Sequence, residues 1–62
     1  MLKKIREGHT VSFKHEDITL YGVIEKIENI EEETYYTIYA NGKLYKHVEK
    51  NLLINDYGVI DD

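Results

Sequence analysis

The dipeptide Asn41-Gly42 constrains the fold of this chain more than any other feature of its sequence. A type I′ turn needs positive φ at both central residues, and asparagine and glycine tolerate that conformation best. Six of the seven residues 34–40, which precede the turn, are β-branched or aromatic, as is typical of a strand. A two-residue turn also fixes the register of its hairpin. The predicted pairs are Ala40–Lys43, Tyr39–Leu44, Ile38–Tyr45, Thr37–Lys46 and Tyr36–His47.

Both faces of the predicted hairpin are apolar. One face carries Tyr36, Ile38, Tyr45 and His47, and the other carries Tyr35, Tyr39 and Leu44. Only one face fits the interior of a small single-core domain, unless the sheet bends strongly. The segment 35–39 has no charge and a high β-propensity, so the second face also predicts a homodimer joined through an edge strand at this segment.

The rest of the sequence predicts an all-β fold. Ile, Val, Thr, Tyr and Phe make up 23 of the 62 residues, whereas alanine occurs once. Residues 10–14 alternate between polar and apolar, which predicts a strand with Val11 and Phe13 facing the core. A turn is predicted at the polar residues after this strand. Residues 52–54 suit a closing strand, and residues 48–51 suit a single 3₁₀ turn before it.

The segment 19–27 predicts a further strand whose phase is ambiguous. Gly22 interrupts this strand and marks either a bulge or a close approach of another backbone. In one phase Val23 and Ile27 face inward, and in the other Ile24 does. A bulge allows Ile24 and Ile27 both to face inward.

Four short segments resemble the KOW and Tudor-like branch of the SH3-like small barrels. They are Glu7-Gly8-x-x-Val11-x-Phe13, Tyr21-Gly22-x-Ile24-x-x-Ile27, Tyr36-x-Ile38 and Leu52-x-Ile54. The resemblance covers residues 5–54 and implies a five-stranded barrel with a short 3₁₀ turn before the last strand, in which Gly22 permits the bend that closes the barrel. The sequence is also similar to very short uncharacterised bacterial proteins built around this pattern, some of them carried by prophages.

Length and charge limit the classes of protein that fit this chain. Its 62 residues form a single domain, predicted as a barrel over 5–54 with a C-terminal tail over 55–62. There is no cysteine, no apolar run near the roughly 20 residues of a membrane span, and no apolar stretch of a signal peptide. We therefore expect a cytoplasmic protein that does not contact a membrane.

Patterns for catalysis and metal binding are missing from the sequence. The single serine, Ser12, lies within a predicted strand, and the four glycines are scattered singly and form no phosphate-binding loop. His9, His15 and His47 fall at separate strand ends without the spacing of a zinc site. The sequence therefore predicts a protein that is not an enzyme and needs no cofactor or metal.

Tyrosines supply the candidate binding surface. The chain has six of them, and a tyrosine ring tends to stay partly exposed because its hydroxyl needs water or a partner. The predicted partner-binding residues are Tyr21, Tyr35, Tyr39 and Leu44, with Lys43 and Lys46 at the rim. The net charge of −4 weakens attraction to a polyanion, which favours a protein partner over nucleic acid.

Two alternatives stay open. Nucleic acid can bind the same face, with bases stacked on the tyrosines and the lysines on phosphates. Alternatively, the chain is a phage or mobile-element inhibitor of a host nuclease, of the anti-CRISPR or anti-restriction type, that presents carboxylates in place of phosphates. The acidic residues for that role are Glu31, Glu32 and Glu33, predicted on a mobile loop, together with Asp61 and Asp62.

Overall fold

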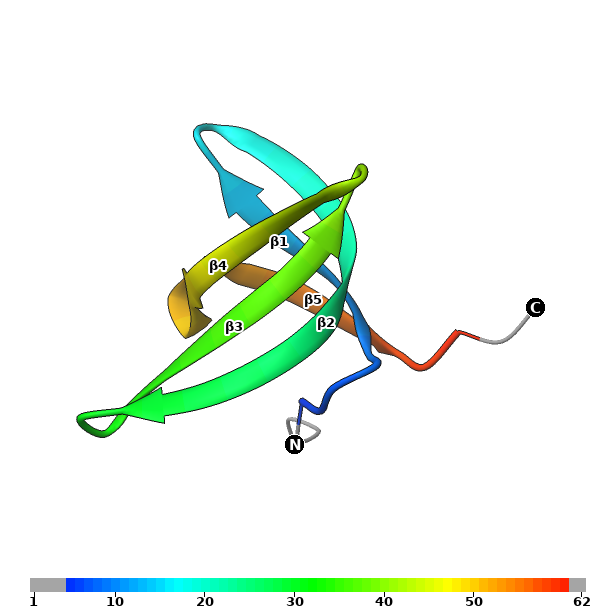
Figure 1. Ribbon diagram of the computed structural model, residues 1–62. Coiled ribbons are helices and arrows are strands. Elements are labelled where there is room, and N and C mark those ends of the chain that lie inside the picture. Colours follow the sequence, from blue (N-terminus) through cyan, green and yellow to red (C-terminus); the bar gives the residue numbers. More distant parts are fainter. Residues whose placement is uncertain (1–4, 61–62) are drawn as a thin grey trace.

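The computed structural model describes residues 5–60, which form one antiparallel sheet of five strands (Figure 1). The elements are β1 (Thr10–His15), β2 (Ile18–Ile30), β3 (Glu33–Ala40), β4 (Lys43–Glu49), the 3₁₀ turn η1 (Lys50–Leu52) and β5 (Leu53–Gly58). The order of strands across the sheet is β4-β3-β2-β1-β5. The predictions of an all-β fold and of a 3₁₀ turn before the last strand are confirmed. Within residues 5–60 the edge strands β4 and β5 do not pair with each other, so the sheet stays open.

The 13-residue strand β2 gives the sheet its curvature. Its first part pairs with β1 as far as Val23, and its second part pairs with β3 from Val23 onward. The register against β3 shifts between Ile24 and Lys26, because Glu25 is an extra residue that forms a bulge. As a result Ile24 is buried and Ile27 packs against the core, so the bulge alternative is confirmed.

Gly22 of β2 lies close to the backbone of β3. A Cβ atom at this position would lie 2.5 Å from the carbonyl oxygen of Tyr39 and 2.7 Å from the Cγ2 atom of Ile38. Real Cβ atoms do not approach other heavy atoms so closely, so only glycine fits here. The prediction of a close backbone approach at Gly22 is confirmed.

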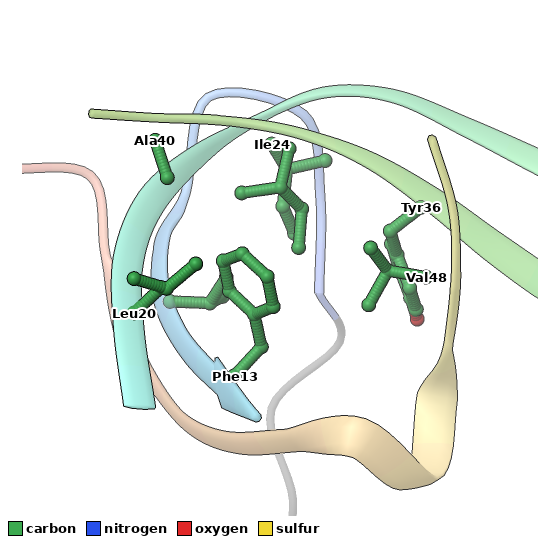
Figure 2. Packing of buried hydrophobic residues seen from close by; sticks show 8 residues of the cluster. Phe13, Leu20, Ile24, Tyr36, Ala40 and Val48 are labelled. Carbon is green, nitrogen blue, oxygen red and sulfur yellow. The ribbon is translucent and has the colours of Figure 1, made fainter. Parts of the chain in front are cut away.

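The concave side of the curved sheet holds the core. Its buried hydrophobic residues are Val11, Phe13, Leu20, Ile24, Tyr36, Ile38, Ala40 and Val48. Figure 2 shows the Phe13 ring at the centre, with Leu20 on one side and Tyr36 and Val48 on the other. The inward orientation predicted for Val11 and Phe13 is confirmed, and the buried face of the β3–β4 hairpin is the one that carries Tyr36 and Ile38.

The register of the β3–β4 hairpin follows the prediction for three pairs and then departs from it. Asn41 and Gly42 both have positive φ, and the pairs Ala40–Lys43, Tyr39–Leu44 and Ile38–Tyr45 are confirmed. Beyond them Thr37 lies opposite two residues, and His47 adopts the left-handed conformation with φ of 58°. Tyr36 therefore pairs with Val48, and the predicted Tyr36–His47 pair is wrong. The bulge places the apolar Val48 in the core and leaves His47 exposed.

The connection between β2 and β3 is a tight two-residue turn, so the acidic loop predicted to hold Glu31, Glu32 and Glu33 is wrong in its extent. β2 continues to Ile30 and pairs there with Glu33, so only Glu31 and Glu32 connect the strands. Their φ values of 49° and 71° resemble those of Asn41 and Gly42, which are 54° and 75°. Strand pairing up to the turn therefore forces two glutamates into the left-handed conformation, which is unfavourable for this residue type.

Two further expectations about the strands need correction. β5 runs from Leu53 to Gly58 and pairs with β1, so residues 55–58 belong to the sheet and are not a tail. The segment 35–39, predicted as the edge that joins two copies, lies in β3 between β2 and β4. Both backbone edges of β3 are already used, so a strand-to-strand dimer would have to use β4 or β5.

Candidate binding surfaces

Five large apolar side chains form a continuous row across the convex side of the sheet. We call this set the outer row; its members are Tyr57, Tyr21, Val23, Tyr39 and Leu44, with exposures between 37% and 61%. Val23 pairs with Tyr39, and Tyr39 pairs with Leu44. Tyr21 and Val23 are two residues apart in β2 and share a face. The ring centroids of Tyr21 and Tyr57 lie 6.2 Å apart. The row thus extends from β5 to β4.

The outer row is exposed because the opposite face of the same strands covers the core. In β2, Tyr21 and Val23 alternate with the buried residues Leu20, Gly22 and Ile24. Among residues 5–60, all five strands belong to this one sheet, and no second layer covers its convex side. The two-faced hairpin predicted from the sequence is therefore resolved by curvature, with one apolar face buried and the other left in solvent.

The structure brings together three of the predicted partner-binding residues. Tyr21, Tyr39 and Leu44 belong to the outer row. Tyr35 does not, because it lies four residues, or about 13 Å, from Tyr39 along β3. It pairs instead with Glu28 and Glu49 and packs edge-on against His47 at 6.0 Å between ring centroids.

Two residues of the outer row were missed by the sequence analysis. Val23 carried a usable signal, because it lies two residues after Tyr21 in the same strand and therefore on the same face. Tyr57 carried none, since residues 55–58 lack the alternation of a strand and were predicted as a tail. The pairing of its neighbours Asp56 and Gly58 with β1 shows that it lies within the sheet.

Lys43 and Lys46, which were predicted at the rim of the binding surface, line a hollow along β4. This hollow, which we call the β4 groove, has a volume of about 340 Å³ and lies between β4, the end of β1 and η1. Its lining consists of Phe13, Lys14, His15, Lys43, Leu44, Tyr45, Lys46, His47, Val48 and Leu52. Five of these ten residues are lysine or histidine, and none is acidic. Leu44 belongs to both surfaces.

The Tyr45 ring forms part of the wall of the β4 groove. The Phe13 ring lies against it at 5.6 Å and the His15 ring at 4.9 Å, both in edge-on orientations. The Lys43 Nζ atom lies 5.4 Å from the ring centroid, within the range of a cation–π contact. Because neighbours surround it on several sides, this ring is not free to stack on a flat ligand.

A polar cluster joins the segment before β1 to β5. The Nδ1 atom of His9 lies 3.1 Å and 3.2 Å from the two carboxylate oxygens of Asp56, and both side chains are partly buried. The backbone N–H of Gly58 donates to the same carboxylate at 2.9 Å. Burial and, to a lesser extent, the charge of Asp56 raise the pKa of Tyr36 above its ordinary value of 10.0. The cluster holds the end of β5 in place.

Ser12 and the three histidines do not form a common site, and each makes its own contacts. Ser12 is buried, and its hydroxyl accepts a hydrogen bond from the backbone N–H of Asn55 at 3.1 Å. His9 binds Asp56, whereas His15 and His47 reach the β4 groove from different strands. The sequence analysis did not foresee that His15 and His47 line one hollow.

The acidic candidates lie at the tip of the β2–β3 hairpin. Glu31, Glu32 and Glu33 are exposed there, and the tip stands away from the rest of the sheet (Figure 1). It extends past the last pair that β2 makes with β1, which is Val23 with Thr10. Asp61 and Asp62, the other predicted acidic residues, lie outside the described residues.

Other kinds of site were also sought in residues 5–60. No group of three or more potential metal ligands comes together in this part of the chain. The described residues also contain no helix of the length and apolarity needed to cross a membrane. The sequence matches no protein-family model and no curated protein, and the fold matches no solved structure. The function is therefore argued from the two surfaces themselves.

Proposed function

We propose that this chain is a small non-catalytic interaction module of the cytoplasm that binds a protein partner across the outer row. We further propose that its fold is an SH3-like small barrel of the KOW and Tudor-like branch. The strand order β5-β1-β2-β3-β4, the bend in β2 and the 3₁₀ turn before β5 support this assignment. The fold alone does not define the function, which rests on the exposed side chains.

The outer row is the observation that carries the proposal. Three tyrosines, a valine and a leucine form one exposed strip, and contiguous apolar patches on small proteins mark interaction sites. Tyrosine is enriched among the residues that dominate binding energy at protein interfaces. Each of these side chains is about half exposed, so covering it contributes roughly 1 kcal/mol of hydrophobic free energy. That free energy favours a partner with an apolar surface of its own.

Nucleic acid fits the outer row less well. Binding of a single strand combines bases stacked on aromatic rings with lysines close to the phosphates. Lys43 and Lys46 line the β4 groove, which shares only Leu44 with the outer row, and the Lys43 Nζ atom already lies 5.4 Å from the Tyr45 ring centroid. The net charge of −4 also opposes the approach of a long polyanion.

The test uses row variants with a matched apolar control. Tyr21→Ser and Tyr39→Ser remove rings from the row, whereas Ile30→Ser removes an exposed apolar side chain near the hairpin tip. Wild type and each variant are used for affinity capture from bacterial lysate, with and without nuclease, and bound proteins are identified by mass spectrometry. We expect the row variants to lose a partner that wild type and Ile30→Ser retain.

Thermal unfolding shows whether the row variants are folded. We expect each to lose about 1 kcal/mol of stability or less, since an exposed cross-strand pair contributes no more than that. Retention of the same partner by both row variants would contradict the proposal. Partners that disappear on nuclease treatment would instead indicate nucleic-acid binding.

The acidic hairpin tip supports a second candidate, an inhibitor of a host nuclease. The tight turn holds Glu31 and Glu32 at a protruding position, with Glu33 beside them. Carboxylates presented in this way can occupy a basic channel that normally binds phosphates. The test is inhibition of DNA cleavage by a restriction or CRISPR nuclease with wild type and with Glu31→Asn/Glu32→Gly, which keeps the turn. Undiminished inhibition by that variant would remove the tip from consideration.

A further inference from the structure

The β4 groove has a local charge opposite to that of the whole protein. Its lining includes three lysines and two histidines but no carboxylate, although the chain carries a net charge of −4. The basic residues come from two separate segments, because Lys14 and His15 end β1 whereas Lys43, Lys46 and His47 lie in β4. A hollow that gathers cations in an acidic protein attracts a ligand with negative charge.

The shape of the groove suits an extended chain. Six consecutive residues of β4, from Lys43 to Val48, contribute to its lining. At about 3.3 Å per residue this stretch is about 16 Å long, which matches five or six residues of extended peptide. Phe13, Val48 and Leu52 add apolar surface between the basic groups.

The free edge of β4 favours a peptide over a nucleic acid. Within residues 5–60, β4 pairs only with β3, so its other edge has backbone groups that an added strand can use. Single-stranded nucleic acid gains most of its affinity from stacking on free aromatic rings. Along β4 the rings that line the groove are those of Tyr45 and His47, and both already pack edge-on against other rings.

We propose that the β4 groove is a second binding site, which takes an acidic, extended peptide segment from a protein partner. Lys14, Lys43 and Lys46 contact its carboxylates, and its backbone lies along the free edge of β4. The site is independent of the outer row except for Leu44, which borders both. A partner with an acidic segment beside an apolar surface would occupy the two sites together.

A fluorescein-labelled hexaglutamate peptide tests this site directly. Fluorescence anisotropy at low ionic strength measures its binding to wild type, Lys43→Gln/Lys46→Gln, Lys14→Gln and the control Lys26→Gln. Lys26 lies in β2 and pairs with Glu28 at 3.5 Å, so the control removes one lysine outside the groove. We expect roughly tenfold weaker binding for the double variant, a smaller loss for Lys14→Gln, and no change for the control.

Backbone amide chemical shifts then locate the peptide. Shifts confined to residues 13–15 and 43–48 would support the proposal, as would unchanged hexaglutamate binding by Tyr39→Ser, which separates this site from the outer row. No binding by wild type, equal binding by the double variant, or shifts on the outer row would overturn it. Tighter binding of hexathymidylate than of hexaglutamate would also overturn it and assign the groove to nucleic acid.

Discussion

Replacing Glu31-Glu32 with Asn-Gly should stabilise this protein, mainly by relieving backbone strain and not by adding a contact. Both glutamates have φ values in the left-handed region, at 49° and 71°. This conformation costs an ordinary L-residue roughly 1–2 kcal/mol, whereas asparagine tolerates it and glycine adopts it freely. The sequence contains its own reference, because Asn41-Gly42 forms the next hairpin turn with nearly the same angles.

The magnitude follows from three contributions. Relief of strain at two positions favours the variant by about 2 kcal/mol. The greater freedom of glycine in the unfolded chain offsets about 0.4–1 kcal/mol of this gain. Less repulsion among Glu31, Glu32 and Glu33 adds a few tenths of a kcal/mol. The net gain is about 1–2 kcal/mol, which raises the melting temperature of a 62-residue domain by roughly 5–15 °C.

Thermal and urea unfolding followed by circular dichroism measure this gain. The matched control, Glu31→Gln/Glu32→Gln, removes the same two charges but keeps side chains that disfavour positive φ. We expect the control to gain only a few tenths of a kcal/mol. If the control is as stable as the Asn-Gly variant, charge and not backbone strain limits the stability of this turn, and the reasoning fails.

Three further predictions concern the interior of the sheet. Gly22→Ala should lower the free energy of unfolding by about 3 kcal/mol or more, because the alanine methyl group would collide with the backbone of β3. A free energy of unfolding within about 1 kcal/mol of wild type would contradict the close approach. Burial first, and then the charge of Asp56, raise the pKa of Tyr36, so the folded state holds the phenolic proton more tightly than the unfolded state does. The stability that this contributes is complete below about pH 10 and is lost as the pH rises through the raised pKa. Urea unfolding at pH 8 and pH 11 should therefore show a smaller alkaline loss for Tyr36→Phe, and equal losses would rule this linkage out. Asp56→Ala should cost about 1–3 kcal/mol by leaving His9 and a backbone N–H without their acceptor, and the argument predicts that Asp56→Asn recovers part of the loss in the same melting experiment.

Local features of the sequence were reliable where one residue type dictates the backbone. Asn41-Gly42 gave the turn and the first three pairs of its hairpin correctly. They did not reveal the bulge at His47, because histidine is enriched at left-handed positions but still adopts them only rarely, so its presence does not mark a bulge. The bulge forms because it places Val48 in the core opposite Tyr36.

The candidate surfaces were predictable to different extents. Strand periodicity places Tyr39 and Leu44 on one face, and the tyrosine hydroxyls favour exposure, but periodicity does not decide which face is buried. The β4 groove was not predictable, because Lys14 and His15 lie about thirty residues from Lys43 in the chain and β1 does not pair with β4. Only the curvature of β2, set by Gly22 and the bulge at Glu25, brings these segments to one hollow.

The sequence by itself determined that this protein is a β-sheet with a hairpin turn at Asn41-Gly42, and which residues next to that turn share a face. These properties follow from backbone preferences and a two-residue period, which act over a few neighbouring residues. Tertiary structure alone decided which apolar face is buried, that residues 55–58 belong to β5, and where the basic side chains gather. Those outcomes depend on packing between segments far apart in the chain. The free energy gained by burying side chains such as Phe13 and Val48 outweighs the conformational cost of holding Glu31 and Glu32 in a left-handed turn.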